Sequence, residues 1–66
     1  MEILLNGVSA PLSGDTTLFA VLSGHRLKPE EVVVELNGRI VPRERFGVTR
    51  LSQGDKVEIL HFVGGG

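Results

Sequence analysis

Two Asn-Gly dipeptides, Asn6-Gly7 and Asn37-Gly38, each separate two short apolar runs. Asparagine and glycine both tolerate positive φ, so this dipeptide favours the tight turn that joins two antiparallel strands. The runs around Asn6-Gly7 alternate apolar and other residues with period two, and the run before Asn37-Gly38 is the most β-prone stretch of the chain. The sequence therefore predicts two β-hairpins, one in residues 1–12 and one in residues 32–41.

A single helical pattern lies between the two hairpins. Its apolar residues recur at i, i+3 and i+4, which places them on one face of a helix. These residues are Leu18, Val21 and Leu22. We expect Asp15 or Thr16 to cap the start of the helix and Gly24 to end it in the left-handed conformation. A helix of about nine residues is marginal alone, so it should pack against a sheet.

The chain closes with a further strand. Residues 43–53 are polar apart from three isolated anchors, Phe46, Val48 and Leu51, and predict a short helical turn followed by a loop. The turn Gly54-Asp55 then leads into an apolar strand over residues 56–63. The expected fold class is α+β, a mixed sheet of about five strands packed on one helix, with the first and last strands parallel and adjacent in its centre. The expected core comprises Ile3, Leu5, Leu18, Val21, Leu22, Val34, Leu36, Val57 and Ile59.

Composition excludes several classes of function. The 66 residues predict one small domain, and the absence of cysteine excludes thiol chemistry. Seven basic residues against eight acidic ones argue against nucleic acid as the main partner. No apolar run is long enough to span a membrane and no targeting segment is visible, so we expect a cytoplasmic protein that acts away from membranes. Two histidines are too few for a metal site, and none is expected.

The last three residues are glycines. We expect residues 1–63 to form the domain and Gly64, Gly65 and Gly66 to form a flexible tail, because glycines carry no side chain to pack. Such a thread can enter a narrow cleft, and the only reactive group at its end is the carboxylate of Gly66. The alternative is a frayed terminus or a cloning remnant.

Two apolar residues next to this tail are candidates for partner binding. Alternation along the last strand places Val57 and Ile59 toward the core, and Leu60 and Phe62 on the opposite, open face. Leu4 or Val33 on neighbouring strands could extend this pair into a docking patch. The alternative is that both are ordinary exposed apolar residues, which are common on protein surfaces.

The chain resembles a known family at two stretches. Residues 37–44, Asn-Gly-Arg-Ile-Val-Pro-Arg-Glu, are similar to the N-x-x-x-V-P-R-E stretch of the ThiS family, and the Gly54-Asp55 turn, the last strand and the glycine ending resemble that family's C-terminus. The resemblance covers the whole chain. It implies the ubiquitin-like β-grasp fold and the function of a sulfur carrier in thiamin biosynthesis.

The resemblance also implies how the carrier works. A ThiF-like adenylyltransferase would use ATP to activate the carboxylate of Gly66, and a cysteine-desulfurase relay would supply the sulfur that converts it to a thiocarboxylate. A ThiG-like thiazole synthase would then take that sulfur. The chain itself would be a protein cofactor, not an enzyme, with no bound cofactor of its own. The alternatives are a sulfur carrier for molybdopterin synthesis, a ubiquitin-like protein modifier, and a β-grasp regulatory or RNA-binding module.

Overall fold

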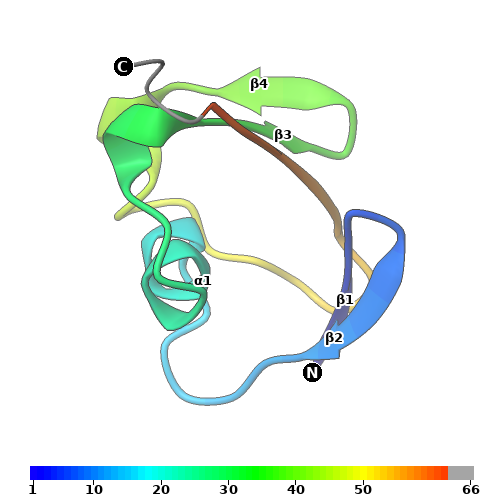
Figure 1. Cartoon of the computed structure of the whole chain (residues 1–66). Coiled ribbons are helices and arrows are strands. Elements are labelled where there is room, and N and C mark those ends of the chain that lie inside the picture. The colour runs from blue at the N-terminus through cyan, green and yellow to red at the C-terminus, as the bar shows by residue number, and fades with distance from the viewer. Residues whose placement is uncertain (63–66) are drawn as a thin grey trace.

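The computed structural model of the chain describes residues 1–62 and shows a curved sheet with one helix on one side of it (Figure 1). The elements in chain order are β1 (Glu2–Leu5), β2 (Val8–Pro11), α1 (Leu18–Gly24), η1 (Pro29–Glu31), β3 (Val32–Leu36), β4 (Arg39–Val41), η2 (Arg43–Arg45) and β5 (Lys56–His61). Within the described residues, the strands form one five-stranded sheet in the order β2-β1-β5-β3-β4. The predicted α+β class and the mixed sheet on one helix are confirmed.

Both Asn-Gly turns form as predicted. Asn6 and Asn37 adopt φ values of 50° and 52°, and the glycines that follow them adopt 82° and 86°. These turns make β1–β2 and β3–β4 antiparallel hairpins. The first and last strands pair in parallel in the centre of the sheet, with Leu5 opposite Val57, and β5 runs antiparallel to β3 on its other side.

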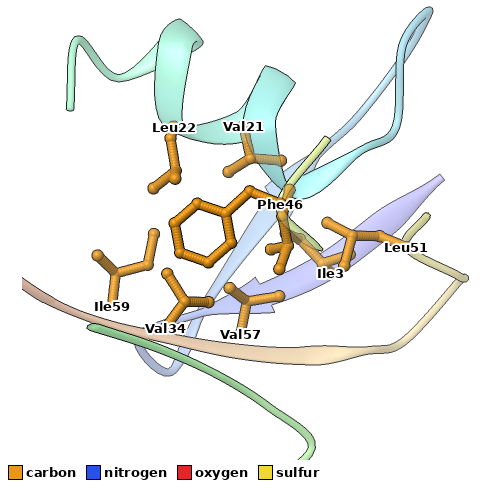
Figure 2. Close-up of a cluster of buried hydrophobic side chains, with 9 residues drawn as sticks. Ile3, Val21, Leu22, Val34, Phe46, Leu51, Val57 and Ile59 are labelled. Carbon is orange, nitrogen blue, oxygen red and sulfur yellow. The ribbon is translucent and has the colours of Figure 1, made fainter. Parts of the chain in front are cut away.

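The core lies between α1 and the inner face of the sheet, as Figure 2 shows. The predicted core residues that are buried are Ile3, Leu18, Val21, Leu22, Val34, Val57 and Ile59. Leu5 and Leu36 are only half-buried, because each lies at the end of its strand, next to a hairpin turn. Three apolar residues were expected to anchor the long loop over residues 43–53. Phe46 and Leu51 are buried, whereas Val48 is 66% exposed.

The caps of α1 differ from the prediction. Thr17, not Asp15 or Thr16, caps the start: its hydroxyl accepts from the backbone N–H of Ala20 at 3.1 Å. Asp15 instead holds the cap residue itself, since its Oδ1 accepts from the backbone N–H of Thr17 at 3.0 Å. That bond and a second one with the Thr17 hydroxyl lower the pKa of Asp15 below its ordinary value of 3.8, with a smaller contribution from the nearby charge of Arg50.

Gly24 is the last residue of the helix and does not adopt the left-handed conformation, so that prediction is wrong. Arg26 does, with φ of 59°. The N–H groups of Arg26 and Leu27 bond back to the carbonyls of Ser23 and Leu22, which is the Schellman pattern of a helix end. The physical reason is packing, because this later turn places Leu27 against the core.

The last strand is shorter than expected. It was predicted over residues 56–63 and ends at His61. The predicted domain boundary after residue 63 and the predicted glycine tail, Gly64 to Gly66, lie outside the described residues.

Candidate functional site

The open face of β5 carries Leu60, and Phe62, the second predicted docking residue, directly follows the strand. Leu60 is 54% exposed and Phe62 is 58% exposed, while Val57 and Ile59 are buried in the core. The strand therefore separates its faces as the alternation predicted. Val33 of β3 lies directly opposite Leu60 in the antiparallel register, so it extends the apolar pair.

Leu4 does not join this patch. It lies opposite Lys56, at the first residue of β5, whereas Leu60 lies four residues further along the strand. At a rise of about 3.3 Å per residue, the two positions are separated by about 13 Å. Parallel pairing of β1 with only Lys56 and Val57 of β5 produces this offset, which the spacing of residues along the chain could not show.

A further apolar residue on the open face is Ile40, which is 68% exposed. It lies opposite Glu35 across β3–β4, and Glu35 lies opposite Glu58 across β3–β5. The open face therefore combines apolar side chains with carboxylates. Sequence reasoning missed Ile40 because only the register of β4 with β3 shows which face it occupies. We call Val33, Ile40, Leu60 and Phe62 the open-face patch.

Glu31, the last residue of η1, contacts the two residues that precede the predicted tail region, His61 and Phe62, which we call the root of the tail. The backbone N–H of Phe62 donates to the carbonyl of Glu31 at 2.7 Å. The Nε2 of His61 lies 3.3 Å from the Oε1 of the same glutamate. His61 is exposed, and its partner lies thirty positions away in the sequence, so the contact could not be predicted from the sequence.

Asn6 also acts on β5, beyond its role in the turn. Its Oδ1 accepts from the backbone N–H of Ile59 at 2.7 Å, and its Nδ2 donates to the carbonyl of the same residue at 3.3 Å. Its backbone N–H donates to the carbonyl of Val57 at 2.9 Å. The side chain thus takes the place of the next strand residue and extends the β1–β5 pairing toward the tail.

Neither a metal-binding cluster nor a membrane-spanning helix is present in the part of the chain that the structure describes. There, no three or more histidine, aspartate or glutamate side chains gather to hold a metal ion. No helix in residues 1–62 has the length and apolar character needed to cross a bilayer. The described residues present a central strand whose open face combines apolar and acidic side chains. Gly66, the predicted reactive residue, and Gly64 and Gly65, the predicted tail, lie outside the described residues, and their roles stay predictions.

A mixed five-stranded sheet curved over one helix, with the first and last strands parallel in its centre, defines a ubiquitin-like β-grasp domain. Comparison with known proteins identifies the family within this class of domain. The ThiS family model matches residues 3–66, and the chain belongs to the ThiS family. This membership confirms the resemblance to the ThiS sulfur carriers of thiamin biosynthesis.

Individual relatives agree with this family. The chain is 40% identical over 63 residues to the sulfur carrier protein ThiS of Bacillus subtilis, covering 94% of this chain and 96% of that protein. The crystal structure of a thiamine biosynthesis protein (ThiS) from Geobacter metallireducens superposes with a TM-score of 0.81 at 38% identity and covers all of both chains. The chain is also 41% identical over 66 residues to a thiazole synthase of Magnetococcus marinus, of whose length it spans only 20%.

Proposed function

We propose that this chain is a sulfur carrier of thiamin biosynthesis and that it carries sulfur on the carboxylate of Gly66. The observation that carries the proposal is the placement of β5: the central strand of a rigid sheet leads directly into a segment that ends in three glycines. Membership of the ThiS family supports the same function. Partner proteins bind the folded domain, and the glycines carry the reacting carboxylate into active sites on those proteins.

The chemistry proceeds in three steps. A free carboxylate is a poor electrophile, so an adenylyltransferase first joins it to AMP from ATP and releases pyrophosphate. A persulfide from a cysteine-desulfurase relay then attacks the carbonyl carbon and displaces AMP, and a partner thiol cleaves the acyl disulfide so formed, which leaves a thiocarboxylate on Gly66 and a disulfide on the partner side. The chain acts as a protein cofactor, and the catalytic groups belong to its partners. Because the first step needs ATP, we propose the cytoplasm as its location.

The acceptor of the sulfur is a thiazole synthase. Supporting this, two thiazole synthases, from Magnetococcus marinus and Paramagnetospirillum magneticum, include a stretch similar to the whole of this chain within a much longer protein. A carrier and a synthase that occur in one polypeptide are expected to work on the same reaction. Docking of this chain would use the open-face patch, which lies beside the root of the tail and offers Leu60 and Phe62 as exposed anchors.

The proposal is tested by following the mass of the intact chain. Incubation with the adenylyltransferase from the same cell, ATP and a sulfur donor should replace one oxygen by sulfur, located in the last peptide. Deletion of Gly66 should abolish this change. Gly65→Val should impair it, because a branched side chain obstructs a thread that passes close to other atoms. Gly47→Val is the matched control, since Gly47 is exposed, its φ is negative, and no atom lies within 4 Å of an added Cβ.

Two results would overturn the proposal. One is an unchanged wild-type mass with a partner that is active on another carrier. The other is thiazole formation supported by the chain that lacks Gly66. A sulfur-loaded chain that passes its sulfur to a molybdopterin precursor, but not to a thiazole synthase, would keep the carrier chemistry and reject the thiamin assignment.

A further inference from the structure

The described residues contain one ion pair, and it lies at the root of the tail. His61 Nε2 and Glu31 Oε1 are 3.3 Å apart, and no other basic and acidic side chains in residues 1–62 approach within 4 Å of each other. His61 is the last residue of β5. A neutral imidazole with its proton on Nε2 donates to the carboxylate as well, so the contact does not depend on the charge of the histidine.

Glu31 makes three contacts that fix its own position and that of the strand end. Its backbone N–H donates to the carbonyl of Lys28 at 2.9 Å, which closes the short helix η1. Its carbonyl accepts from the N–H of Phe62 at 2.7 Å, and its carboxylate meets His61. Pro29 begins η1 and restricts its backbone. One residue therefore clasps the last two described residues of the chain through its main chain and its side chain together.

This clasp contributes little to global stability. Both side chains of the ion pair are about 40% exposed, and pairs of that kind have small free energies because water screens them. The location of the clasp, at the end of β5, indicates its role better than its small free energy does. The pairing of β3 with β5 ends at Val32 opposite His61, and Phe62, the last described residue, donates its backbone N–H to the carbonyl of Glu31.

We propose that Glu31, acting through His61 and Phe62, is a positioning residue that sets where and in which direction the tail leaves the domain. This inference rests on the proposed function of Gly66. Four residues follow Phe62, and they reach at most about 14 Å when extended. A partner that binds the open-face patch therefore meets the carboxylate in its active site only when the root of the tail is correctly placed.

The test compares two neighbouring glutamates in the adenylation reaction. Glu31→Ala removes the carboxylate from the clasp, and Glu30→Ala removes the same charge from the same short helix at an exposed residue for which the structure shows no contact with His61 or Phe62. We expect Glu31→Ala to lower kcat about tenfold while KM for the carrier changes less than about twofold, since a misplacement of about 1 Å can lower a rate by about 100-fold. Glu30→Ala should leave both constants at the wild-type values.

A second variant and a spectroscopic measurement separate positioning from a merely structural role. His61→Ala should lower kcat similarly, and the double variant Glu31→Ala/His61→Ala should be no slower than either single variant, because both changes remove one contact. Hydrogen exchange at the Phe62 amide should become faster in Glu31→Ala and stay unchanged in Glu30→Ala, with the amides of the core strands protected in both.

Three outcomes would overturn the inference: an unchanged kcat in Glu31→Ala, equal losses in Glu30→Ala and Glu31→Ala, or a rise in KM without a fall in kcat, which would make Glu31 a docking contact. Failure of the proposed function is distinguishable, because then the wild-type chain itself is not adenylated.

Discussion

Asn6 is the residue whose replacement tests the fold argument most directly. Its side chain bonds to both backbone groups of Ile59, at 2.7 Å and 3.3 Å, and its backbone adopts a φ of 50°. Asn6→Ala removes both bonds and forces an alanine into the left-handed region. The affected amide of Ile59 is in the central strand that leads to the tail, so the change loosens the sheet where it supports the proposed site.

The expected loss of stability follows from these contacts. Two hydrogen bonds contribute about 1 kcal/mol each, and the left-handed conformation costs an alanine about 1 kcal/mol. Asn6→Ala should therefore lower the free energy of unfolding by about 3 kcal/mol. Asn6→Gly, which loses the bonds but tolerates the conformation, should lose about 2 kcal/mol. A domain of this size has roughly 3–10 kcal/mol in total, so the alanine variant approaches the limit of folding.

Urea unfolding followed by circular dichroism at 25 °C measures these losses. With a slope of about 1 kcal/mol per molar for a small domain, the midpoint should fall by about 3 M for Asn6→Ala and about 2 M for Asn6→Gly. Asn37→Ala is the matched control, because Asn37 has the same conformation, but its side-chain bonds to Lys56 and Asp55 are exposed and water can replace them. Equal losses at the two asparagines, or a loss below about 0.5 kcal/mol at Asn6, would refute the reasoning, since ordinary surface substitutions stay within that range.

Three other predictions follow from the same structure. Phe62→Asp should weaken binding of the carrier to its adenylyltransferase by more than about 1 kcal/mol without lowering the melting temperature. Val8→Asp, at a residue 68% exposed on the outer strand β2, should leave binding unchanged. Equal binding of the two variants in calorimetry would remove Phe62 from the docking surface. Phe46→Ala should lower the free energy of unfolding by about 3–4 kcal/mol, because this side chain is 2% exposed and its removal leaves a cavity. A denaturation midpoint near that of the wild type would contradict the place of Phe46 in the core. The pKa of Asp15 is lower in the folded chain than its ordinary value of 3.8, so its contribution to stability is present above that value and is lost as the pH falls through the folded pKa. Unfolding measured between pH 5 and about 2 should show this acid loss in the wild type and a smaller one in Asp15→Asn, which keeps the acceptor for the Thr17 amide; identical pH profiles would count against it.

Local chemistry determined much of this protein from the sequence alone. The two Asn-Gly turns formed as predicted because the need for positive φ is a property of the dipeptide itself, and it does not depend on distant residues. Alternation along the strands and the helical spacing in residues 18–22 correctly assigned the inner face, because the side chains of a strand or helix point in directions set by its own geometry. For the same reason, the open-face position of Leu60 was predicted correctly, and Phe62 is exposed as expected.

The tertiary structure decided which distant residues meet. The register of β5 against β1 and β3 brings Val33, but not Leu4, beside Leu60. The long loop buries Phe46 and exposes Val48, although the spacing of these residues favours neither. Packing of Leu27 goes with a left-handed residue at Arg26, two positions after the helix ends, and not at Gly24. The clasp between Glu31 and His61 and the bond from Asn6 to Ile59 join residues that are far apart in the sequence, because register and chain crossing, which no local pattern encodes, determine such contacts.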